Sequence, residues 1–199
     1  MVTHVKGVDP RVKRTLQLLQ QALLELVQEK HFASITVQDI AERASVNRAT
    51  FYAHFEDKYD LLESTIREQF QREVVKKLPT GCKWGVSTLR VLIGAVFDYL
   101  PEMQSQRRPT DMQLDSLFER TAQEELREYL LSWLKQVPAS GMRRVPLETM
   151  ASMMSWAILG TAVQWSHGAR TTTTEQMVTY VLSVITEGVA HLTPGLVMV

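Results

Sequence analysis

The sequence predicts an all-α protein of about nine helices, and three observations support this class. Apolar residues recur at helical spacing through most of the chain, and no stretch alternates as a half-buried strand would. Short segments containing Pro or Gly separate the helical stretches. Residues that favour helix caps precede several of these stretches. We therefore expect two helical domains, residues 1–72 and residues 73–199.

The composition is ordinary for a soluble protein, with 45% hydrophobic and 22% charged residues. The formal net charge is zero, so the molecule as a whole lacks the basic balance of many nucleic-acid binders, although one surface can still be basic. A single cysteine, Cys82, excludes an intramolecular disulfide and suits a reducing compartment. The start of the chain has no apolar signal region, and no apolar run reaches about 20 residues. We expect a cytoplasmic protein with no membrane segment.

The first helix is expected to begin at Pro10 and to end at about Lys30, after a frayed arm over residues 1–9. Pro suits the first position of a helix, and leucines at helical spacing form one apolar stripe. Three cations, Arg11, Lys13 and Arg14, lie in the first turn, where the helix dipole disfavours them. They are either a solvated basic end or phosphate contacts, and the segment that follows favours phosphate contacts.

That segment, Ile35 to Leu62, predicts two short helices joined by a tight turn and then the start of a third. Thr36 followed by Asp39 is a capping-box pattern, and Asn47 is well suited to cap the next helix. Phe51 and Phe55 are four residues apart and must face inward. The other side chains of this second helix are small or polar, as in a helix-turn-helix whose second helix enters the major groove. The alternative is an ordinary helical hairpin.

The same residues resemble the DNA-binding segment of the TetR (tetracycline repressor-like) family of bacterial transcription regulators. The resemblance covers about residues 11 to 72, with the helix-turn-helix at about 36–55. The matching residues are Thr36, Ile40, Ala41, Ala44, Val46, Thr50, Phe51, Tyr52, His54, Phe55, Lys58, Leu61 and Leu62. The rest of the chain matches only in helical character and length. The resemblance implies an N-terminal DNA-binding domain and a C-terminal ligand-binding and dimerisation domain.

Matching the chain to the family motif gives a set of expected DNA-binding residues: Arg14, Thr36, Gln38, Asn47, Arg48, Ala49, Thr50, Tyr52, His54 and Lys58. Arg48 is the best candidate for a bidentate contact to guanine, while His54 and Lys58 are expected on phosphates. Ala49 departs from the Gly or Pro that is frequent in the family, so its contact stays open, a thymine methyl being one candidate.

The rest of the chain is expected to form five more helices. Their expected limits are about Tyr59–Lys77, about Trp84–Leu100, about Met112–Gln136, Leu147–His167 and Glu175–Leu192. Loops are expected at residues 79–81, 104–110 and 138–146, and Pro101 should kink or stop its helix. The helix from Tyr59 should link the DNA-binding head to the body and act as a lever in any switch.

The last two helices are apolar on more than one face, so each must cover something besides its own core. By resemblance they form a four-helix interface with a second subunit; the alternative is that both are interior helices of a monomer. Family members often enclose an apolar cavity, for which Phe97, Met103, Trp133, Trp156 and Trp165 are the candidate lining residues. The alternative for each is plain core.

The expected function is therefore a homodimeric, sequence-specific transcription repressor released from a palindromic operator by a small hydrophobic ligand. A regulator or adaptor gated by a protein partner is the alternative, and an all-helical enzyme a remoter one. The histidines lack metal-ligand spacing, and no Gly-rich phosphate loop is present. We expect no catalytic residue, no metal and no cofactor.

Overall fold

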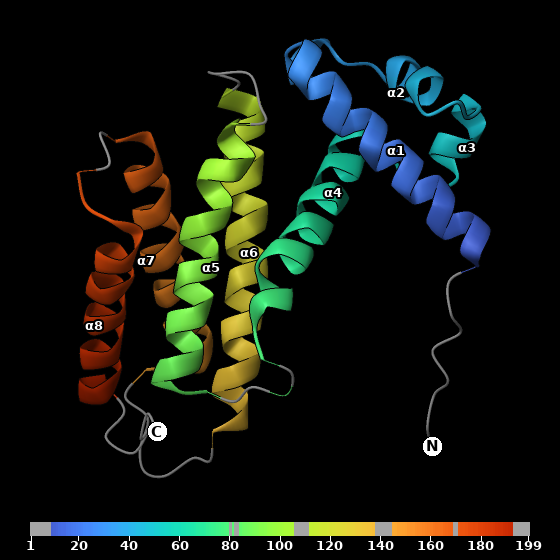
Figure 1. The fold of residues 1–199 in the computed structure, drawn as a ribbon. Helices are drawn as coiled ribbons and strands as arrows, with labels where there is room; N and C mark the ends of the chain where they lie inside the picture. Colours follow the sequence, from blue (N-terminus) through green and yellow to red (C-terminus); the bar gives the residue numbers. More distant parts are fainter. Residues whose placement is uncertain are drawn as a thin grey trace, which may run out of the picture. The chain divides into compact units, whose positions relative to one another are not determined.

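A computed structural model describes residues 9–79, 81, 84–105, 112–137, 145–168 and 171–192. Over these residues the chain forms eight α-helices and two short 3-10 helices, and none of them lies in a strand (Figure 1). The all-α prediction is confirmed, and the expected count of about nine helices is close. The helices are α1 (Pro10–Glu29), η1 (Phe32–Ser34), α2 (Val37–Arg43), α3 (Arg48–Tyr52), α4 (Lys58–Glu73), η2 (Val75–Lys77), α5 (Val86–Ser105), α6 (Met112–Gln136), α7 (Leu147–His167) and α8 (Thr174–Leu192).

The described chain packs as two compact units, and α4 contributes residues to both. The first unit runs to Thr65 and includes the start of α6, up to Asp115; the second contains Ile66–Ser105 and the chain from Ser116 onward. The domain limits expected from the sequence, 1–72 and 73–199, remain predictions.

In the first unit, α1 packs against α2, and α2 packs against α3 (Figure 1). Pro10 is the first residue of α1, and the Asp9 side chain caps the helix by accepting from the Arg11 amide at 2.9 Å. The core of this unit is the inner face of each helix, where Leu19, Leu23, Phe32, Ile40 and Phe51 are fully or almost fully buried. This core seats the two short helices that follow α1.

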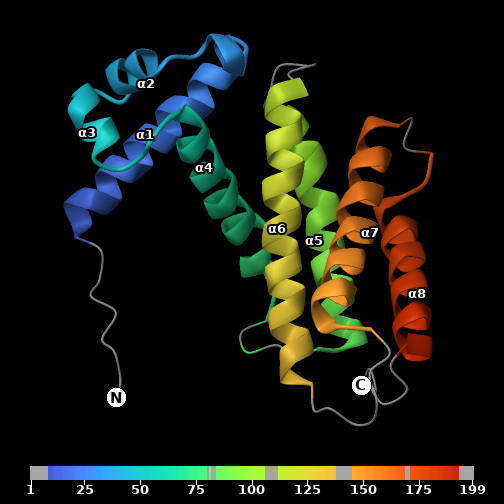
Figure 2. The same ribbon diagram turned by 180° about the vertical axis from the view of Figure 1, so that it is seen from behind.

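The second unit is built on α5, which contacts both α7 and α8 (Figure 2). Its dense apolar sequence is explained by burial on several sides, and Leu89, Leu92, Ile93 and Val96 are all fully buried. Pro101 was expected to kink or stop this helix, and it does not stop it, because α5 continues to Ser105. Phe97 and Leu100 are each 1% exposed, and burial of this order offsets the roughly 3 kcal/mol that an interior proline costs.

Several helix limits differ from the sequence-based expectations in an informative way. The second helix of the turn motif ends at Tyr52 instead of Phe55, and α4 ends at Glu73, followed by the 3-10 turn η2. The limits expected for α6 and α7 agree with the structure. Cys82, most of the N-terminal arm and most of the loops expected at 104–110 and 138–146 lie outside the described residues. None of the helices in the described ranges combines the length and apolarity that crossing a membrane requires.

Candidate DNA-binding interface

The α3 helix is held by two phenylalanines on its inner side. Phe51 is fully buried and Phe55 is 6% exposed, and their ring centroids lie 5.9 Å apart. Asn47 caps the helix: its side-chain oxygen accepts from the Ala49 amide at 2.8 Å. Burying two such rings stabilises the unit by several kcal/mol, about 1.5–3 kcal/mol for each. The predicted inward pair and the predicted cap are both confirmed.

The turn between α2 and α3 depends on one unusual backbone conformation. Ser45 has a φ of 55°, and it is the only non-glycine residue in the described ranges with a positive φ. The left-handed region costs an ordinary residue about 1–2 kcal/mol. Two backbone hydrogen bonds, Ser45 N to Glu42 O at 3.0 Å and Val46 N to Ala41 O at 2.9 Å, hold the chain in this turn.

Most of the expected DNA-binding side chains lie on the outer side of α2 and α3 or on α1. Arg14, Gln38, Asn47, Arg48, Ala49 and Tyr52 are exposed, whereas Thr50 and His54 are half-buried. The exposed face of α3 therefore presents Arg48, Ala49 and Tyr52 to solvent. Their roles as DNA contacts remain predictions.

Arg48 and Tyr52 form a pair on the exposed face of α3. The Arg48 guanidinium donates to the Tyr52 hydroxyl at 3.1 Å and lies 5.4 Å from the centroid of the Tyr52 ring. Tyr52 is itself fixed from below, because its ring makes an edge contact with Phe51 at 5.5 Å between centroids. A guanidinium held this way has fewer rotamers to lose when it binds a partner.

Thr36 and Gln38, like Asn47, have local structural roles. Thr36 and Asp39 form the predicted capping box: the Thr36 amide donates to Asp39 Oδ2 at 2.7 Å, and the Asp39 amide donates to the Thr36 hydroxyl at 3.1 Å. Gln38 donates its side-chain amide to Glu42 one turn later on α2. These bonds place Thr36 and Gln38 at the start of α2 without defining a DNA contact.

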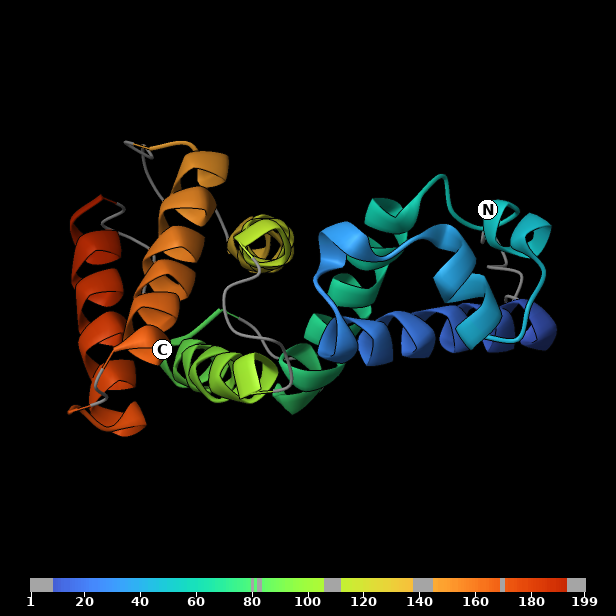
Figure 3. The ribbon, with the colours of Figure 1, turned by 90° about the horizontal axis from the view of Figure 1, so that it is seen from above.

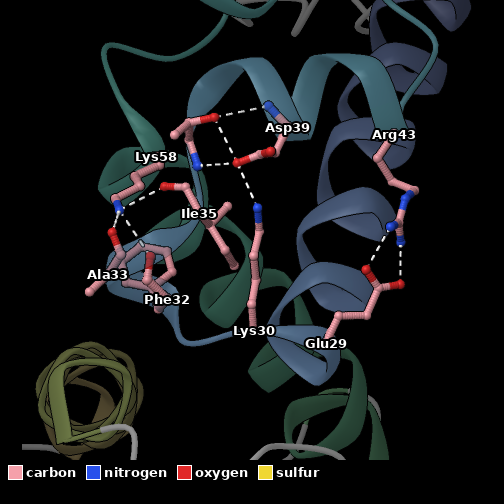
Figure 4. Close-up of polar contacts among 9 residues, drawn as sticks. Glu29, Lys30, Phe32, Ala33, Ile35, Asp39, Arg43 and Lys58 are labelled. Atoms are coloured by element: carbon pink, nitrogen blue, oxygen red, sulfur yellow. Dashed lines mark hydrogen bonds and ion pairs between the residues drawn. The ribbon is translucent and has the colours of Figure 1, made fainter.

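Lys58, expected on a phosphate, is engaged inside the first unit. Its ammonium donates to three backbone carbonyls, Phe32 O at 2.9 Å, Ala33 O at 3.0 Å and Ile35 O at 2.8 Å (Figure 4). The nitrogen also lies 4.8 Å from the centroid of the Phe32 ring. An ammonium has three N–H donors, so this arrangement leaves no donor for a phosphate. The geometry argues against the phosphate contact that the family motif suggests.

Two ion pairs clasp α2 to α1 and to Lys30, the residue that follows α1 (Figure 4). Arg43 binds Glu29 with two hydrogen bonds of 2.8 and 2.7 Å, and Lys30 Nζ lies 2.8 Å from Asp39 Oδ2. Hydrogen bonds from Lys30 and then from Thr36 lower the pKa of Asp39 well below its usual range. The hydrogen bond from Arg43 likewise lowers the pKa of Glu29 and raises that of Arg43. Asp39 and Glu29 are thus each paired with a cation.

Comparison with known proteins agrees with this geometry. Residues 19–65 match the profile of bacterial regulatory proteins of the tetR family. A curated relative, the uncharacterized HTH-type transcriptional regulator YxbF of Bacillus subtilis (strain 168), is 43% identical over 63 residues, which are 31% of this chain. The chain therefore carries an N-terminal domain of the TetR family. It spans only 17% of the length of YxbF.

Solved TetR-like structures share the fold along most of the chain. A putative TetR-family regulator from Syntrophomonas wolfei has a TM-score of 0.60 at 21% identity, covering 94% of this chain and 98% of that one. The regulator FadR from Bacillus subtilis, solved in complex with stearoyl-CoA, has a TM-score of 0.54 at 18% identity, covering 86% and 98%. At these identities the likeness shows the fold alone.

The five residues expected to line a ligand cavity lie in different surroundings. Phe97 and Trp165 lie together, with centroids 5.6 Å apart, and Met103 is buried. The ring centroids of Trp133 and Tyr129 lie 4.9 Å apart. Trp133 also lines an open groove of about 510 Å³, and the other four candidates are not part of its lining. Trp156 is 52% exposed on α7, so its surroundings in this structure are those of a surface residue.

Sequence reasoning missed the carbonyls that Lys58 binds and the partners of Arg43 and Asp39 on the α1 side. The aromatic Phe32 and the acidic Glu29 were visible in the sequence, but their distance from Lys58 and Arg43 along the chain hid the contacts. The ranges that the structure describes hold no group of three or more His, Cys, Asp or Glu side chains placed to bind an ion.

The lowered pKa of Asp39 predicts acid-dependent stability. A carboxyl group whose pKa falls on folding stabilises the fold above its ordinary pKa of about 3.9, and this contribution is lost as the pH falls from that value through the lower pKa of the folded state. Asp39→Asn keeps a side-chain oxygen for the Thr36 amide but removes the charge that pairs with Lys30. We expect a loss of about 0.5–1 kcal/mol at neutral pH and a smaller difference from wild type near pH 2, well below the ordinary pKa of the group.

Urea unfolding at both pH values measures this difference. Asp98→Asn, on the exposed side of α5, is the matched control and should shift stability little at either pH. An Asp39→Asn deficit of equal size at both pH values would show that the ion pair is not its cause.

Proposed function

We propose that this TetR protein is a homodimeric repressor that places α3 of each subunit in the major groove of a palindromic operator. The observation that carries the proposal is the α2–α3 unit, in which a short helix is seated by two buried rings and turns polar side chains outward. The fold is that of TetR-family DNA-binding regulators. In this motif the second helix reaches base edges with the residues of its first turn.

Base reading is proposed for Arg48, with Ala49, Thr50 and Gln38 beside it. Arg48 begins α3 and is exposed, so it can reach the groove without rebuilding the helix. Its contact with Tyr52 orders the guanidinium, whose planar fork matches the O6 and N7 acceptors of guanine. Tyr52 would then serve as the support for Arg48 or as a contact of its own.

Phosphate binding is proposed for the cations at the start of α1 and for backbone amides. Arg11, Lys13 and Arg14 are exposed there. The ion pairs of Arg43 with Glu29 and of Lys30 with Asp39 reduce the repulsion that free carboxylates near the motif would exert on DNA. The first turns of helices also supply N–H groups suited to phosphate oxygens.

Dimerisation is proposed through α7 and α8, which lie side by side in the second unit (Figure 3). These helices expose Met153 at 60%, Trp156 at 52%, Tyr180 at 57% and Val184 at 70%. Large apolar side chains gathered on neighbouring helices favour a partner surface over contact with water. A two-fold dimer also suits a reader of two half-sites about 34 Å apart.

A small-molecule effector is proposed to act on the second unit. The open groove that Trp133 lines is the candidate site for it. It is lined by Gln71, Val75, Lys76, Leu78, Pro79, Gly81, Tyr129, Ser132, Trp133 and Gln136. This lining combines apolar and aromatic surface with one lysine and no carboxylate, which favours an amphipathic anion. The FadR complex with stearoyl-CoA supports a ligand of this kind.

Because α4 contributes residues to both units, it is the proposed lever that couples effector binding to the helix-turn-helix. The alternative is gating by a protein partner at an exposed apolar face.

The base-reading proposal predicts the behaviour of Arg48→Ala. We expect it to weaken binding to a selected operator by about 1–3 kcal/mol and to relax preference at one base position in each half-site. Selection from random duplexes with wild-type and variant protein gives both quantities. Tyr52→Phe keeps the ring but removes the hydroxyl. Its operator affinity should lie between that of wild type and that of Arg48→Ala. Equal weakening on every duplex would make Arg48 a phosphate contact.

The dimer proposal predicts that a charge on the α7–α8 surface separates the subunits. Trp156→Glu and Val184→Glu should each raise the dimer dissociation constant at least tenfold, because burying an unpaired carboxylate costs several kcal/mol. Sedimentation across a concentration series measures it. Met112→Glu is the matched control, since Met112 is 83% exposed and belongs to the first unit. Wild-type protein that sediments as a monomer at all concentrations would refute the dimer.

The effector proposal predicts that an amphipathic anion lowers operator affinity. Fatty acids and acyl thioesters should quench Trp133 fluorescence and weaken operator binding at least tenfold. Lys76→Met should reduce this response, whereas Lys77→Met should preserve it, because only Lys76 lines the groove. A panel with no effect on operator affinity would favour the protein-gated alternative.

A further inference from the structure

The contacts of Lys58 assign it a role that its place in the motif does not suggest. Lys58 is the first residue of α4, and its three acceptors belong to the short corner between α1 and α2. Two of the acceptors, Phe32 O and Ala33 O, belong to η1; the third, Ile35 O, immediately precedes Thr36, the N-cap of α2. One side chain therefore joins the start of α4 to the entry of the helix-turn-helix.

The surroundings of the ammonium are built for a cation. The nitrogen lies 4.8 Å from the Phe32 ring centroid and 5.5 Å from that of Tyr59, and these two rings make an edge contact at 5.3 Å. Tyr59 is held in turn by Gln113, whose amide donates to its hydroxyl at 3.1 Å. Carbonyl oxygens and aromatic faces both stabilise a positive charge.

Moving the Lys58 ammonium to a phosphate would break hydrogen bonds for the ammonium and for the carbonyls that it now binds. The ammonium would give up three hydrogen bonds of 2.8 to 3.0 Å, and the carbonyls of the corner would lose their shared donor. Two of these bonds are partly buried, and hydrogen bonds to charged groups are among the stronger ones in proteins. A phosphate contact at the surface of DNA would replace them with a single screened interaction.

We infer that Lys58 is a positioning residue for DNA binding: its ammonium locks the corner of residues 32–35 to the start of α4, and thereby fixes the orientation of α2 and α3. Displacing the start of α4 then carries the corner with it, since the three bonds join them. The inference rests on the proposed DNA-binding function for its DNA readout, and on the fold alone for its stability readout.

The first test compares Lys58→Met, Lys58→Arg and Lys13→Met in the full chain. Lys58→Met keeps the aliphatic stem without donors, and Lys58→Arg keeps the charge on a planar fork that cannot converge on three carbonyls. We expect both Lys58 variants to lower the folded-to-unfolded ratio about tenfold or more. Lys13→Met, at an exposed site on α1, should leave it unchanged.

The second readout is the salt dependence of binding to duplex DNA, which counts phosphate contacts. Each contact contributes a slope of about 0.9 in the logarithm of affinity against salt. The slope of both Lys58 variants should equal that of wild type, whereas Lys13→Met should lose about one contact. A normal ratio of folded to unfolded protein in Lys58→Met, together with a slope lowered by one and restored in Lys58→Arg, would overturn the inference.

Amine labelling of the wild-type chain tests the role of Lys58 even if the Lys58 variants fail to fold. Reductive methylation followed by mass spectrometry should modify Lys58 far more slowly than Lys13 without DNA. Adding duplex DNA should protect Lys13 and leave Lys58 unchanged. Fast labelling of Lys58 that DNA then suppresses would identify a phosphate contact. Failure of wild type to bind any duplex would refute the proposed function, while the stability result would still decide the role of Lys58.

Discussion

A helix of five residues such as α3 is not stable by itself in water, and much of the first unit holds it in place. Isolated helices shorter than about 12–15 residues are marginal even with favourable sequences, and α3 runs only from Arg48 to Tyr52. Its stability comes from burial of Phe51 and Phe55 and from the Asn47 cap. Because the inner side is used for anchoring, the outer side is available for polar residues.

The same constraint explains why the contacts around α2 are polar and numerous. A seven-residue helix buries little apolar surface, and of α2 only Ile40 and Ala41 are fully inside. The capping box, the Arg43–Glu29 pair and the Lys30–Asp39 pair supply attachment that packing alone does not. Individually such exposed pairs contribute little. Together they attach the two sides of the connection between α1 and α2, and Lys58 binds the carbonyls of Phe32, Ala33 and Ile35 within that connection.

In the second unit the helices are long, and they carry more apolar surface than the core of one subunit buries. The α5 helix is covered well enough to tolerate Pro101 in its interior. The α7 and α8 helices each bury one face and still expose large apolar side chains, with Val184 70% exposed. Gly160 and Gly188 lie on these helices at points where a Cβ would meet no atom within 4 Å. Such open, small positions leave room for close approach of another helix.

The sequence by itself determined the class, the helix-turn-helix and its caps, because these depend on contacts within about four residues. Thr36 with Asp39, Asn47 with its helix, and the Phe51–Phe55 pair all belong to this local kind. The limits of α6 and α7 followed from the same periodicity. Residues matched to the family motif, such as Arg48, could be named but not given partners.

Only the tertiary structure decided which side chains meet across long stretches of chain. Lys58 binds carbonyls 23 to 26 residues earlier, and Arg43 pairs with a glutamate 14 residues away. Periodicity carries no information about such pairs, since it reports which face of a helix is buried and not what covers it. For the same reason Trp133 and Trp156 look alike in the sequence. One is 3% exposed and the other 52% exposed, because the packing of neighbouring helices, and not residue type, sets what each one touches.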